Sequence, residues 1–452
     1  MKIIAIIAEY NPLHQGHAWQ IREARHRLGP DSAVLVVMSG PFTQRGEPAV
    51  VDKWRRTRMA LDAGVNLVLE LPFAYACGSA ERFASGGVQM IQSTGLDSHL
   101  VFGSESGDLA ALANVAGILA HEPDGFRERL QNYLGQGLSF PAARQKAFAE
   151  WTGNDEQAAL LGTSNNILAI EYLKAIIRLP QSRLTPMTIR RVGQGYTIRD
   201  LPGAQTDWLA CGPEADPAAG QDQARTFASA TAIRRSLEKR MRAGSQPDLA
   251  GLLNDLVALV PSFTLAELMT CIQTGPGPVF PCDLSALILS QLRSRADKDL
   301  EQIAGMGEGL ERRLMAASSR PSGKTADTHA GCHLETLLID ADTRRFPQTR
   351  IQRALMSMIC GLTQADLDLF DQSGGPQYLR VLGFDSRGRY LLKIMRKLAE
   401  KPIITKASDF LEFGGSPALA RMAGLDRIAS DVWSLAAGRP CGQDFDTPVL
   451  MR

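Results

Sequence analysis

The stretch that decides the fold lies at 3–38, where IIAIIA at 3–8 and AVLVVM at 33–38 enclose EYNPLHQGH at 9–17 and a polar stretch that ends near Leu28. The two short apolar runs are bounded by turn signals, as buried strands are. Two strands joined in this way by a helix form a βαβ unit, in which the strands run parallel. These residues therefore predict the start of an α/β domain.

The same alternation continues downstream. Helices are predicted at Lys53–Ala63 and Ala80–Ile91, and strands at Val65–Leu71 and near His99–Phe102. Repeated alternation of this kind is typical of a Rossmann-like, doubly wound parallel sheet, which binds ligands at the carboxyl ends of its strands.

The length and composition indicate more than one domain. The chain has 452 residues and is 44% hydrophobic, and its net charge of +1 gives no global electrostatic footprint for nucleic acid. Any RNA site must therefore be a local basic patch. The apolar amino-terminal run is too short to span a membrane and has no cleavage site, so we expect a cytoplasmic protein without a membrane partner. Seven scattered cysteines contain no C-x-x-C pair, so no metal site is expected.

The composition changes twice in the second half of the chain. Residues 201–225 are rich in Pro, Gly, Ala, Asp and Gln, as exposed loops are, and AGSQPD near 245 precedes a new amphipathic run. We therefore expect a catalytic domain at 1–245 and a mainly helical domain at 246–452.

The first motif with chemical content is Asn11-Pro12-Leu13-His14-Gln15-Gly16-His17, between a predicted strand and a predicted helix. Two imidazoles at this spacing, beside a helix amino end, can stabilise charge at the α-phosphate and on leaving pyrophosphate. Gly16 permits close approach of a nucleotide. The alternative is a strand-to-helix turn in which both histidines are incidental. The position of the motif favours catalytic roles for His14 and His17.

A second motif, Ser229-Ala230-Thr231-Ala232-Ile233-Arg234, opens a predicted helix. Ser229 and Thr231 are capping residue types, and the Arg234 guanidinium has the fork geometry that suits phosphate oxygens. Taken alone, this is an ordinary capped surface helix. Together with the first motif, it resembles the Ser-x-Thr-x-Ile-Arg phosphate motif of the HIGH-type nucleotidyltransferase superfamily, which implies a catalytic role for Arg234.

The resemblance extends further, to the tRNA-Met cytidine acetate ligase family. It is carried by AEYNPLHQGH, VMSGPFTQRGEPAVVDKWRRTRMAL, FGSESGD, SNNILAIEYLKAI, FASATAIR, TRRFPQTRIQRALM and YLRVLGFDSRGRYLLK, in this order along the chain. Only the loop at 201–225 and the region from about 245 to 335 contain nothing diagnostic. The resemblance implies that the second half of the chain binds RNA.

What the family resemblance implies is an ATP-dependent ligase that makes acetyl-adenylate from acetate. The acetyl group would pass to N4 of the wobble cytidine of elongator tRNA-Met, giving N4-acetylcytidine. ATP with Mg²⁺ would be the cofactors, and acetate and elongator tRNA-Met the partners, with no protein partner evident. Two rivals remain: a nucleotidyltransferase for a phosphorylated metabolite, and a non-catalytic RNA-binding protein with a relic nucleotide fold.

By the same resemblance, ATP would be bound by the amino-terminal motif and by residues after later strands. Asn166 is favoured over Asn165, and Arg191 over Arg190. The full expected set is Ile7, Ala8, Glu9, Tyr10, Asn11, Pro12, His14, Gly16, His17, Gln20, Gly103, Asn165, Asn166, Arg190, Arg191, Ser229 and Thr231. The family's histidine after the arginine pair is absent from 195–200, which removes a base role for that loop.

A glycine-rich loop, Ser39–Pro48, follows the second predicted strand and so reaches the same edge of the sheet. We predict that Ser39, Gly40 and Arg45 contact acetate or the adenylate. Equally, Arg45 and Glu47 are a surface ion pair that holds the loop.

Basic residues cluster in the second half of the chain, and such clusters bind RNA phosphates in a salt-dependent way. Each cluster taken alone is more often a solvated helix face. The predicted tRNA-binding residues are Arg345, Arg350, Arg353, Arg389 and Lys393.

Overall fold

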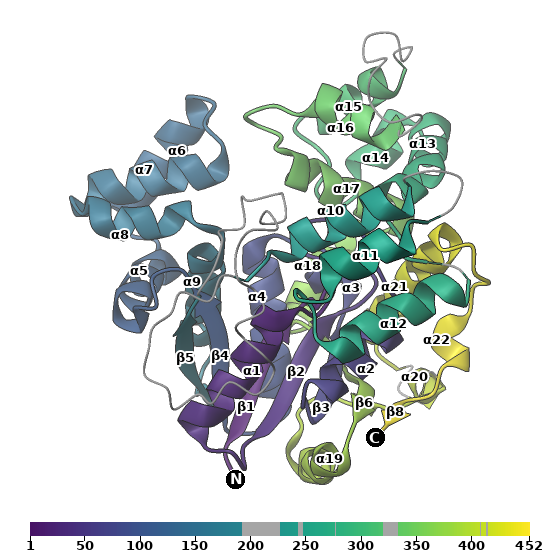
Figure 1. Ribbon diagram of the computed structural model, residues 1–452. Coiled ribbons are helices and arrows are strands. Elements are labelled where there is room, and N and C mark those ends of the chain that lie inside the picture. The colour runs from purple at the N-terminus through teal and green to yellow at the C-terminus, as the bar shows by residue number, and fades with distance from the viewer. Residues whose placement is uncertain (192–226, 243–246, 276, 320–332, 407, 413–414) are drawn as a thin grey trace.

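The computed structural model describes residues 1–191, 227–242, 247–275, 277–319, 333–406, 408–412 and 415–452. The predicted loop at 201–225, the segment 195–200 and the predicted boundary near 245 lie outside these ranges. Within them, an eight-stranded sheet has the strand order β5-β4-β1-β2-β3-β6-β7, with β8 paired to β6 (Figure 1).

The strands are β1 (Ile3–Ala8), β2 (Ala33–Ser39), β3 (Leu67–Leu71), β4 (Ser98–Ser104), β5 (Leu184–Arg190), β6 (Leu379–Phe384), β7 (Ile403–Ile404) and β8 (Leu450–Met451). The first five are parallel to one another, which confirms the predicted doubly wound sheet. The chain leaves β3 and returns beside β1 as β4, so the winding direction reverses at β1 and β4. Ligands bind at the carboxyl ends of the strands at such a reversal.

The helices of the first half are α1 (Gln15–Leu28), α2 (Lys53–Asp62), α3 (Phe73–Ala76), α4 (Ala80–Ser93), α5 (Leu109–His121), α6 (Asp124–Gly135), α7 (Phe140–Thr152), α8 (Asp155–Ala159), α9 (Ser164–Ile177) and α10 (Ala230–Met241). Alternate residues of each central strand face different cores. Ile3 packs in the core that includes α4 and α9, whereas Ile4 packs in the core that includes α1 and α2. Helices thus cover both faces, as a buried parallel sheet requires.

The helices of the second half are α11 (Leu249–Leu256), α12 (Ser262–Gln273), α13 (Ser285–Ser294), α14 (Asp297–Glu301), α15 (Leu310–Ser318), α16 (His333–Ala341), α17 (Gln348–Cys360), α18 (Gln364–Gln372), α19 (Ser386–Leu398), α20 (Asp409–Glu412), α21 (Pro417–Ala436) and α22 (Gln443–Asp446). This half is mainly helical, as predicted, but it also supplies β6, β7 and β8, which were not predicted. β6 pairs antiparallel with β3. Residues on both sides of 245 therefore build one sheet.

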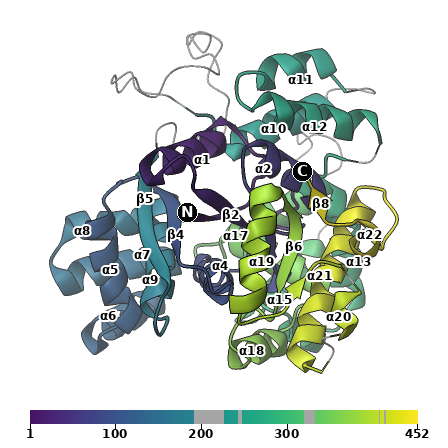
Figure 2. The same ribbon diagram turned by 90° about the horizontal axis from the view of Figure 1, so that it is seen from below.

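The surrounding helices form separate groups. In Figure 1, α5 to α8 stand to one side of the sheet, in the connection between β4 and β5, and α13 to α17 lie above the carboxyl ends of the strands. Figure 2 shows α19 beside β6 on the underside of the molecule. No described helix combines the length and the apolar character needed to cross a lipid bilayer.

Candidate active site

A cavity of about 210 Å³ opens at the carboxyl ends of β1, β4 and β5, where the winding of the sheet reverses. Thirteen of the predicted site residues are among those that line it: Ile7, Ala8, Glu9, Tyr10, Asn11, His14, Gly16, His17, Gln20, Arg45, Gly103, Asn165 and Arg191. The lining residues that the sequence did not predict are Trp19, Gln44, Ala80, Phe83, Phe102, Ser164, Leu168, Tyr172, Ile189, Phe227 and Ala230. Most of these are apolar or aromatic, a residue type that a motif search does not separate from the core.

The His-x-Gly-His turn is built from its own backbone. His14 is the N-cap of α1, and its Nδ1 accepts a hydrogen bond from Gly16 N at 3.1 Å. His17 Nδ1 in turn accepts from His14 N at 3.3 Å, and the two rings stack with their centroids 3.8 Å apart. A side chain at Gly16 would place its Cβ 2.9 Å from His14 Cε1. Gly16 is therefore required by the first imidazole as well as by any ligand.

Both imidazoles are held in the neutral form. Burial lowers the pKa of His17 to about 3, with a further contribution from the nearby Arg191. Burial, His17 and two arginines lower the pKa of His14 well below its usual value. Because Nδ1 of each ring is an acceptor, the proton of each neutral ring lies on Nε2. The turn thus presents two hydrogen-bond donors to the cavity.

Tyr10 lies under this turn in a strained conformation. Its φ of 47° is in the left-handed region, which costs a non-glycine residue about 1 kcal/mol or more. Its buried ring packs edge-on against His17, with the centroids 5.1 Å apart. His17 therefore has ring contacts with both Tyr10 and His14.

Arg234 reaches the same turn from α10, but it does not line the cavity. Its Nη1 donates to Asn11 O at 3.0 Å, and its Nη2 forms an ion pair with Glu47 Oε2 at 2.7 Å. Ser229 caps α10 through Ala232 N, and Thr231 Oγ1 accepts from Arg234 Nη2. Ser229, Thr231 and Arg234 thus hold the motif together rather than forming the wall of the cavity.

The two asparagines differ in a way that reverses the preference drawn from the sequence. Asn166, the favoured residue, is buried, and its Oδ1 accepts from the backbone amides of Glu105 and Ser106 at 2.9 and 3.1 Å. Asn165 lines the cavity and accepts a 2.6 Å hydrogen bond from Arg191 Nη1. Asn165 is therefore the asparagine that lines the cavity, and the ATP contact expected of Asn166 stays a prediction.

The preference for Arg191 over Arg190 agrees with the structure. Arg191 lines the cavity, whereas Arg190, at the end of β5, is exposed. Pro12, in the middle of the amino-terminal motif, is buried and is not among the lining residues.

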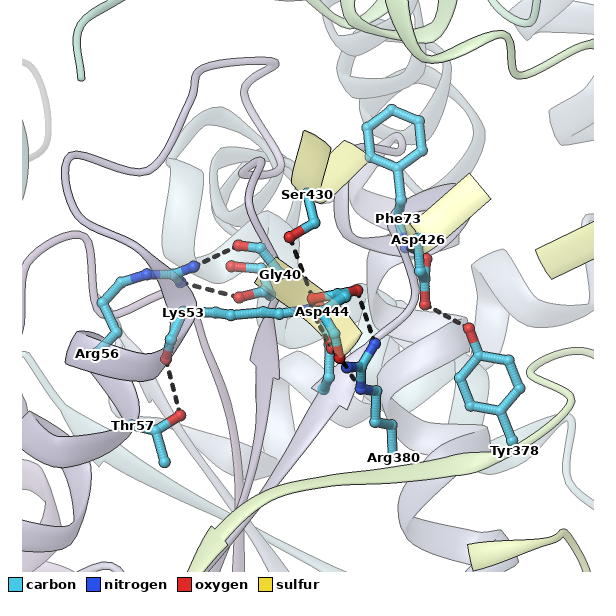
Figure 3. A network of polar contacts seen from close by, with 12 residues as sticks. Gly40, Lys53, Arg56, Thr57, Phe73, Tyr378, Arg380, Asp426, Ser430 and Asp444 are labelled. Atoms are coloured by element: carbon cyan, nitrogen blue, oxygen red, sulfur yellow. Dashed lines mark hydrogen bonds and ion pairs between the residues drawn. The ribbon is translucent and has the colours of Figure 1, made fainter. Parts of the chain in front are cut away.

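The loop after β2 meets the cavity through its tip rather than its base. Gln44 and Arg45 line the cavity. Ser39 and Gly40 are not among the lining residues, and their carbonyl oxygens accept hydrogen bonds from the buried guanidinium of Arg56 (Figure 3). Their predicted contact with acetate or the adenylate stays a prediction, and Arg45 is the member of that set that lines the cavity.

Glu9 follows β1 and meets this loop. Gln44 N donates to Glu9 Oε1 at 2.8 Å. Burial raises the pKa of Glu9, although the amide of Gln44 and two arginines oppose that shift. The alternative ion pair of Arg45 with Glu47 is replaced by the pair of Arg234 with Glu47.

The predicted tRNA-binding residues fall into three settings. Arg345 and Arg350 lie near Glu308, with nitrogen-to-oxygen distances of 3.5 and 3.2 Å. Arg353 instead donates to Gln44 O at 3.4 Å, and burial lowers its pKa. Arg353 therefore supports the cavity loop, and its assignment to tRNA phosphates stays a prediction.

Arg389 and Lys393 are exposed on α19. This helix contacts the amino-terminal edge of the sheet, where Asp385 accepts from Asn66 Nδ2 at 2.7 Å and Arg387 pairs with Asp31. Arg345 and Arg350 thus lie towards the carboxyl ends of the parallel strands, near α17, whereas Arg389 and Lys393 of α19 lie at the amino ends (Figure 1).

Known proteins resemble this chain along its whole length. A model of the HIGH Nucleotidyl Transferase family matches residues 1–206 and 216–446. The tRNA(Met) cytidine acetate ligase of Acetivibrio thermocellus is 35% identical over 457 residues, which cover 100% of both chains. That of Caldanaerobacter subterraneus subsp. tengcongensis is 38% identical over 436 residues, which cover 96% of each chain.

Solved structures agree. A crystal structure of Thermotoga maritima TmcAL bound with alpha-thio ATP is 32% identical, covers 100% of this chain and 99% of its own, and gives a TM-score of 0.83. The apo form of the same protein gives a TM-score of 0.85 at 31% identity. With the parallel sheet and the His-x-Gly-His turn at its reversal point, these matches define a HIGH-type nucleotidyltransferase. More specifically, the chain belongs to the tRNA(Met) cytidine acetate ligase family, which confirms the resemblance drawn from the motifs.

Proposed function

We propose that this protein makes acetyl-adenylate from ATP and acetate and transfers the acetyl group to N4 of the wobble cytidine of elongator tRNA-Met. The observation that carries the proposal is the pair of neutral imidazoles that line a cavity at the reversal point of the sheet. Membership of the ligase family supports the choice of acetate and tRNA as substrates. The alpha-thio ATP bound by the Thermotoga maritima relative supports ATP as the nucleotide.

In the first half-reaction, an acetate oxygen attacks the α-phosphate and pyrophosphate leaves. The Nε2–H groups of His14 and His17 donate to the oxygens on which charge develops. Arg191, held by Asn165 at 2.6 Å, keeps its positive charge and stabilises the phosphates. Arg45, at the tip of the loop, is suited to the acetate carboxylate.

In the second half-reaction, the cytidine amine attacks the acyl carbon of the mixed anhydride and AMP leaves. No covalent intermediate on the protein is needed. The cavity walls must hold the amine and the anhydride in reach of each other, and this positioning supplies much of the rate.

Mg²⁺ stays a prediction, and the residues at hand do not form a protein-built site for it. Mg²⁺ in nucleotide enzymes is held by one or two carboxylates together with substrate phosphates. Glu9 is the one carboxylate among the described residues that line the cavity, and these residues contain no group of three or more metal-ligating side chains. We assign no step of the reaction to the ion.

Acetate-dependent exchange of labelled pyrophosphate into ATP tests the first half-reaction. The proposal expects exchange with acetate and no added RNA or acetyl-coenzyme A. Exchange that is independent of acetate, or tRNA acetylation that requires acetyl-coenzyme A, would contradict it.

A further inference from the structure

The proposed transfer step, on which this inference rests, releases a proton that some group must accept. The exocyclic amine of cytidine is a weak nucleophile, because its lone pair is delocalised into the ring. Once its nitrogen bonds to the acyl carbon, the nitrogen carries an excess proton. A positioned base that removes this proton contributes about 10²–10⁴-fold to the rate of such steps.

The two histidines are poor candidates for that base. Nδ1 of each ring already accepts a backbone hydrogen bond, at 3.1 Å for His14 and 3.3 Å for His17. Nε2 of each neutral ring carries the proton and is a donor. A second proton would create a buried cation beside Arg191, which lines the same cavity.

Glu9 has the geometry of a proton acceptor. It lines the cavity at the end of β1, and Gln44 N holds its Oε1 at 2.8 Å. Its Oε2 receives no hydrogen bond from the residues that the structure describes. One oxygen is thus fixed and the other remains available to a substrate. An anchored carboxylate is also the side chain that suits the N4 amine of cytosine, which is a hydrogen-bond donor.

The charges around Glu9 come from several elements. Arg45 and Glu47 face it from the loop, Arg234 from α10 and Arg56 from α2, and the thiol of Cys77 lies beyond α3. Burial outweighs the arginines and raises the pKa of Glu9. A carboxylate with a raised pKa binds a proton more readily than an ordinary carboxylate, which suits a proton acceptor.

We propose that Glu9 is the catalytic base of the transfer step. The cytidine N4 bonds to the acyl carbon, the bond from that carbon to the phosphate oxygen of AMP breaks, and AMP leaves with the bonding electrons. The amine proton passes to Glu9 Oε2 and then to solvent. Gln44 is a positioning residue, because its amide aims the carboxylate.

Transfer can be measured apart from adenylation by supplying synthetic acetyl-adenylate. Wild type, Glu9→Gln and Glu9→Asp are mixed with acetyl-adenylate and saturating tRNA-Met without ATP, and the transfer rate is followed against pH. Wild-type transfer should slow as the pH falls through the pKa of Glu9. Glu9→Gln should transfer about 10²–10⁴-fold more slowly, without that pH dependence, and Glu9→Asp should recover part of the rate.

The matched control is Glu81→Gln, in the first turn of α4, whose carboxylate pairs with Lys174 and Arg178 and is 53% exposed. This variant should transfer like wild type, and thermal unfolding of each variant checks folding. Transfer by Glu9→Gln at the wild-type rate and with the wild-type pH profile would overturn the role of Glu9. A defect confined to KM for acetyl-adenylate would also overturn it, because Glu9 would then be a binding residue. If wild type itself transfers nothing, the proposed function fails instead.

Discussion

The imidazoles of the His-x-Gly-His turn are oriented by main-chain amides, and no carboxylate of the described residues pairs with either ring. Burial keeps both rings neutral by lowering their pKa, and the nearby Arg191 adds to that effect. Neutral donors stabilise developing phosphate charge without changing protonation between ground state and transition state. The turn therefore works over a broad pH range, and acid sensitivity of the reaction must come from other groups.

Replacing His17 by alanine should slow acetate-dependent pyrophosphate exchange by about 10²–10³-fold, since a preorganised donor to developing charge is lost. Affinity for tRNA, measured by filter binding, should change by no more than a few-fold. The control is His26→Ala on the same helix, whose side chain is 67% exposed. Unchanged exchange in His17→Ala would mean that the turn is structural only.

The sequence predicted the residues of this turn but not which asparagine faces the cavity. The first turn of α9 is fixed by Glu105, whose carboxylate accepts from the backbone amides of Asn165 and Asn166 at 3.1 and 2.7 Å. These two hydrogen bonds set the rotation of α9 about its axis, and the Asn166 side chain then bonds to the backbone amide of Glu105. The partner is about 60 residues away in the chain, so adjacent asparagines cannot be separated by local pattern.

At the scale of elements, the loop after β2 connects the cavity with the second half of the chain. Arg234 of α10 forms an ion pair with Glu47 of this loop. Arg353 of α17 donates a hydrogen bond to the carbonyl oxygen of Gln44 in the same loop. The amide of that same Gln44 holds Glu9. A displacement of α17 would therefore move Gln44 and, through its amide, the Glu9 carboxylate.

Gly46→Ala tests the contact between the loop after β2 and α17. Gly46 has φ 76°, and an added Cβ would lie 2.9 Å from Arg353 Cα, so the loop must move away from α17. Acetate-dependent exchange should fall at least several-fold. Gly137→Ala is the matched control, because φ is 81° there and nothing lies within 4 Å of the new Cβ. Because alanine is strained at this φ, Gly137→Ala should lower the free energy of unfolding by about 1 kcal/mol without loss of activity. Equal activity in both variants would show that the contact between this loop and α17 does not affect the reaction.

The predicted tRNA-binding residues lie on two separate surfaces of the structure. Reversing the charge of each group shows which surface binds tRNA. Arg345 and Arg350 lie on the α17 side, near the loop of the cavity, and Arg345 is 62% exposed. Reversing both to glutamate should weaken tRNA binding and lower the log–log salt slope by roughly one unit per lost phosphate contact. Pyrophosphate exchange without RNA is the control reaction.

The same reversal at Arg389 and Lys393 examines α19 at the opposite edge of the sheet. If only that pair changes the salt slope, tRNA approaches from the amino-terminal edge and the proposed surface on the α17 side is wrong. The sequence could not separate the two surfaces, because each is a pair of nearby basic residues and only the fold places the pairs on different sides of the molecule.

At the scale of the whole molecule, a buried polar network joins the two halves of the chain (Figure 3). Lys53 of α2 pairs with Glu70 of β3 at 2.8 Å and with Asp444 at 2.6 Å, and Arg380 of β6 pairs with Asp444 at 2.8 Å. Breaking a buried pair by removing one partner typically costs about 3–5 kcal/mol. The network thus ties the antiparallel strand β6 to β3 and links residues from the two halves of the chain.

Asp426, next to this network, should give the stability a measurable pH dependence. Burial and Glu70 raise its pKa to about 7, well above the value in an unfolded chain. The native state then holds a proton that the unfolded chain has released, so this stabilising contribution is lost as the pH rises from about 4 to about 7. Tyr378 and Phe73 N hold the carboxyl in place.

Asp426→Asn removes that titration and keeps the shape of the side chain. Its unfolding free energy, measured by chemical denaturation, should improve relative to wild type as the pH rises across that window. Each unit of pKa difference corresponds to about 1.4 kcal/mol. Asp446→Asn, at an exposed position of α22, is the control and should show a constant difference. A constant difference for Asp426→Asn would mean that Asp426 is ionised in the native protein.

The strands β1 to β4 could be predicted because their signals are local: apolar runs, turns and helical stretches alternate in order. The fifth parallel strand, β5, was not predicted. The extension by β6 could not be predicted, because it depends on Lys53, Glu70, Arg380 and Asp444 meeting across more than 300 residues of chain. Charged residues read from sequence are expected on the surface. Their burial here is a property of the assembled fold.

The central claim is that the acetyl group reaches tRNA from free acetate by way of ATP. It is tested most directly by mass spectrometry of nucleosides from tRNA-Met incubated with the protein, ATP and isotopically labelled acetate. We expect N4-acetylcytidine that carries the label, formed only when both ATP and acetate are present. Labelled product that appears without ATP, or acetylation that takes place only from acetyl-coenzyme A, would contradict it.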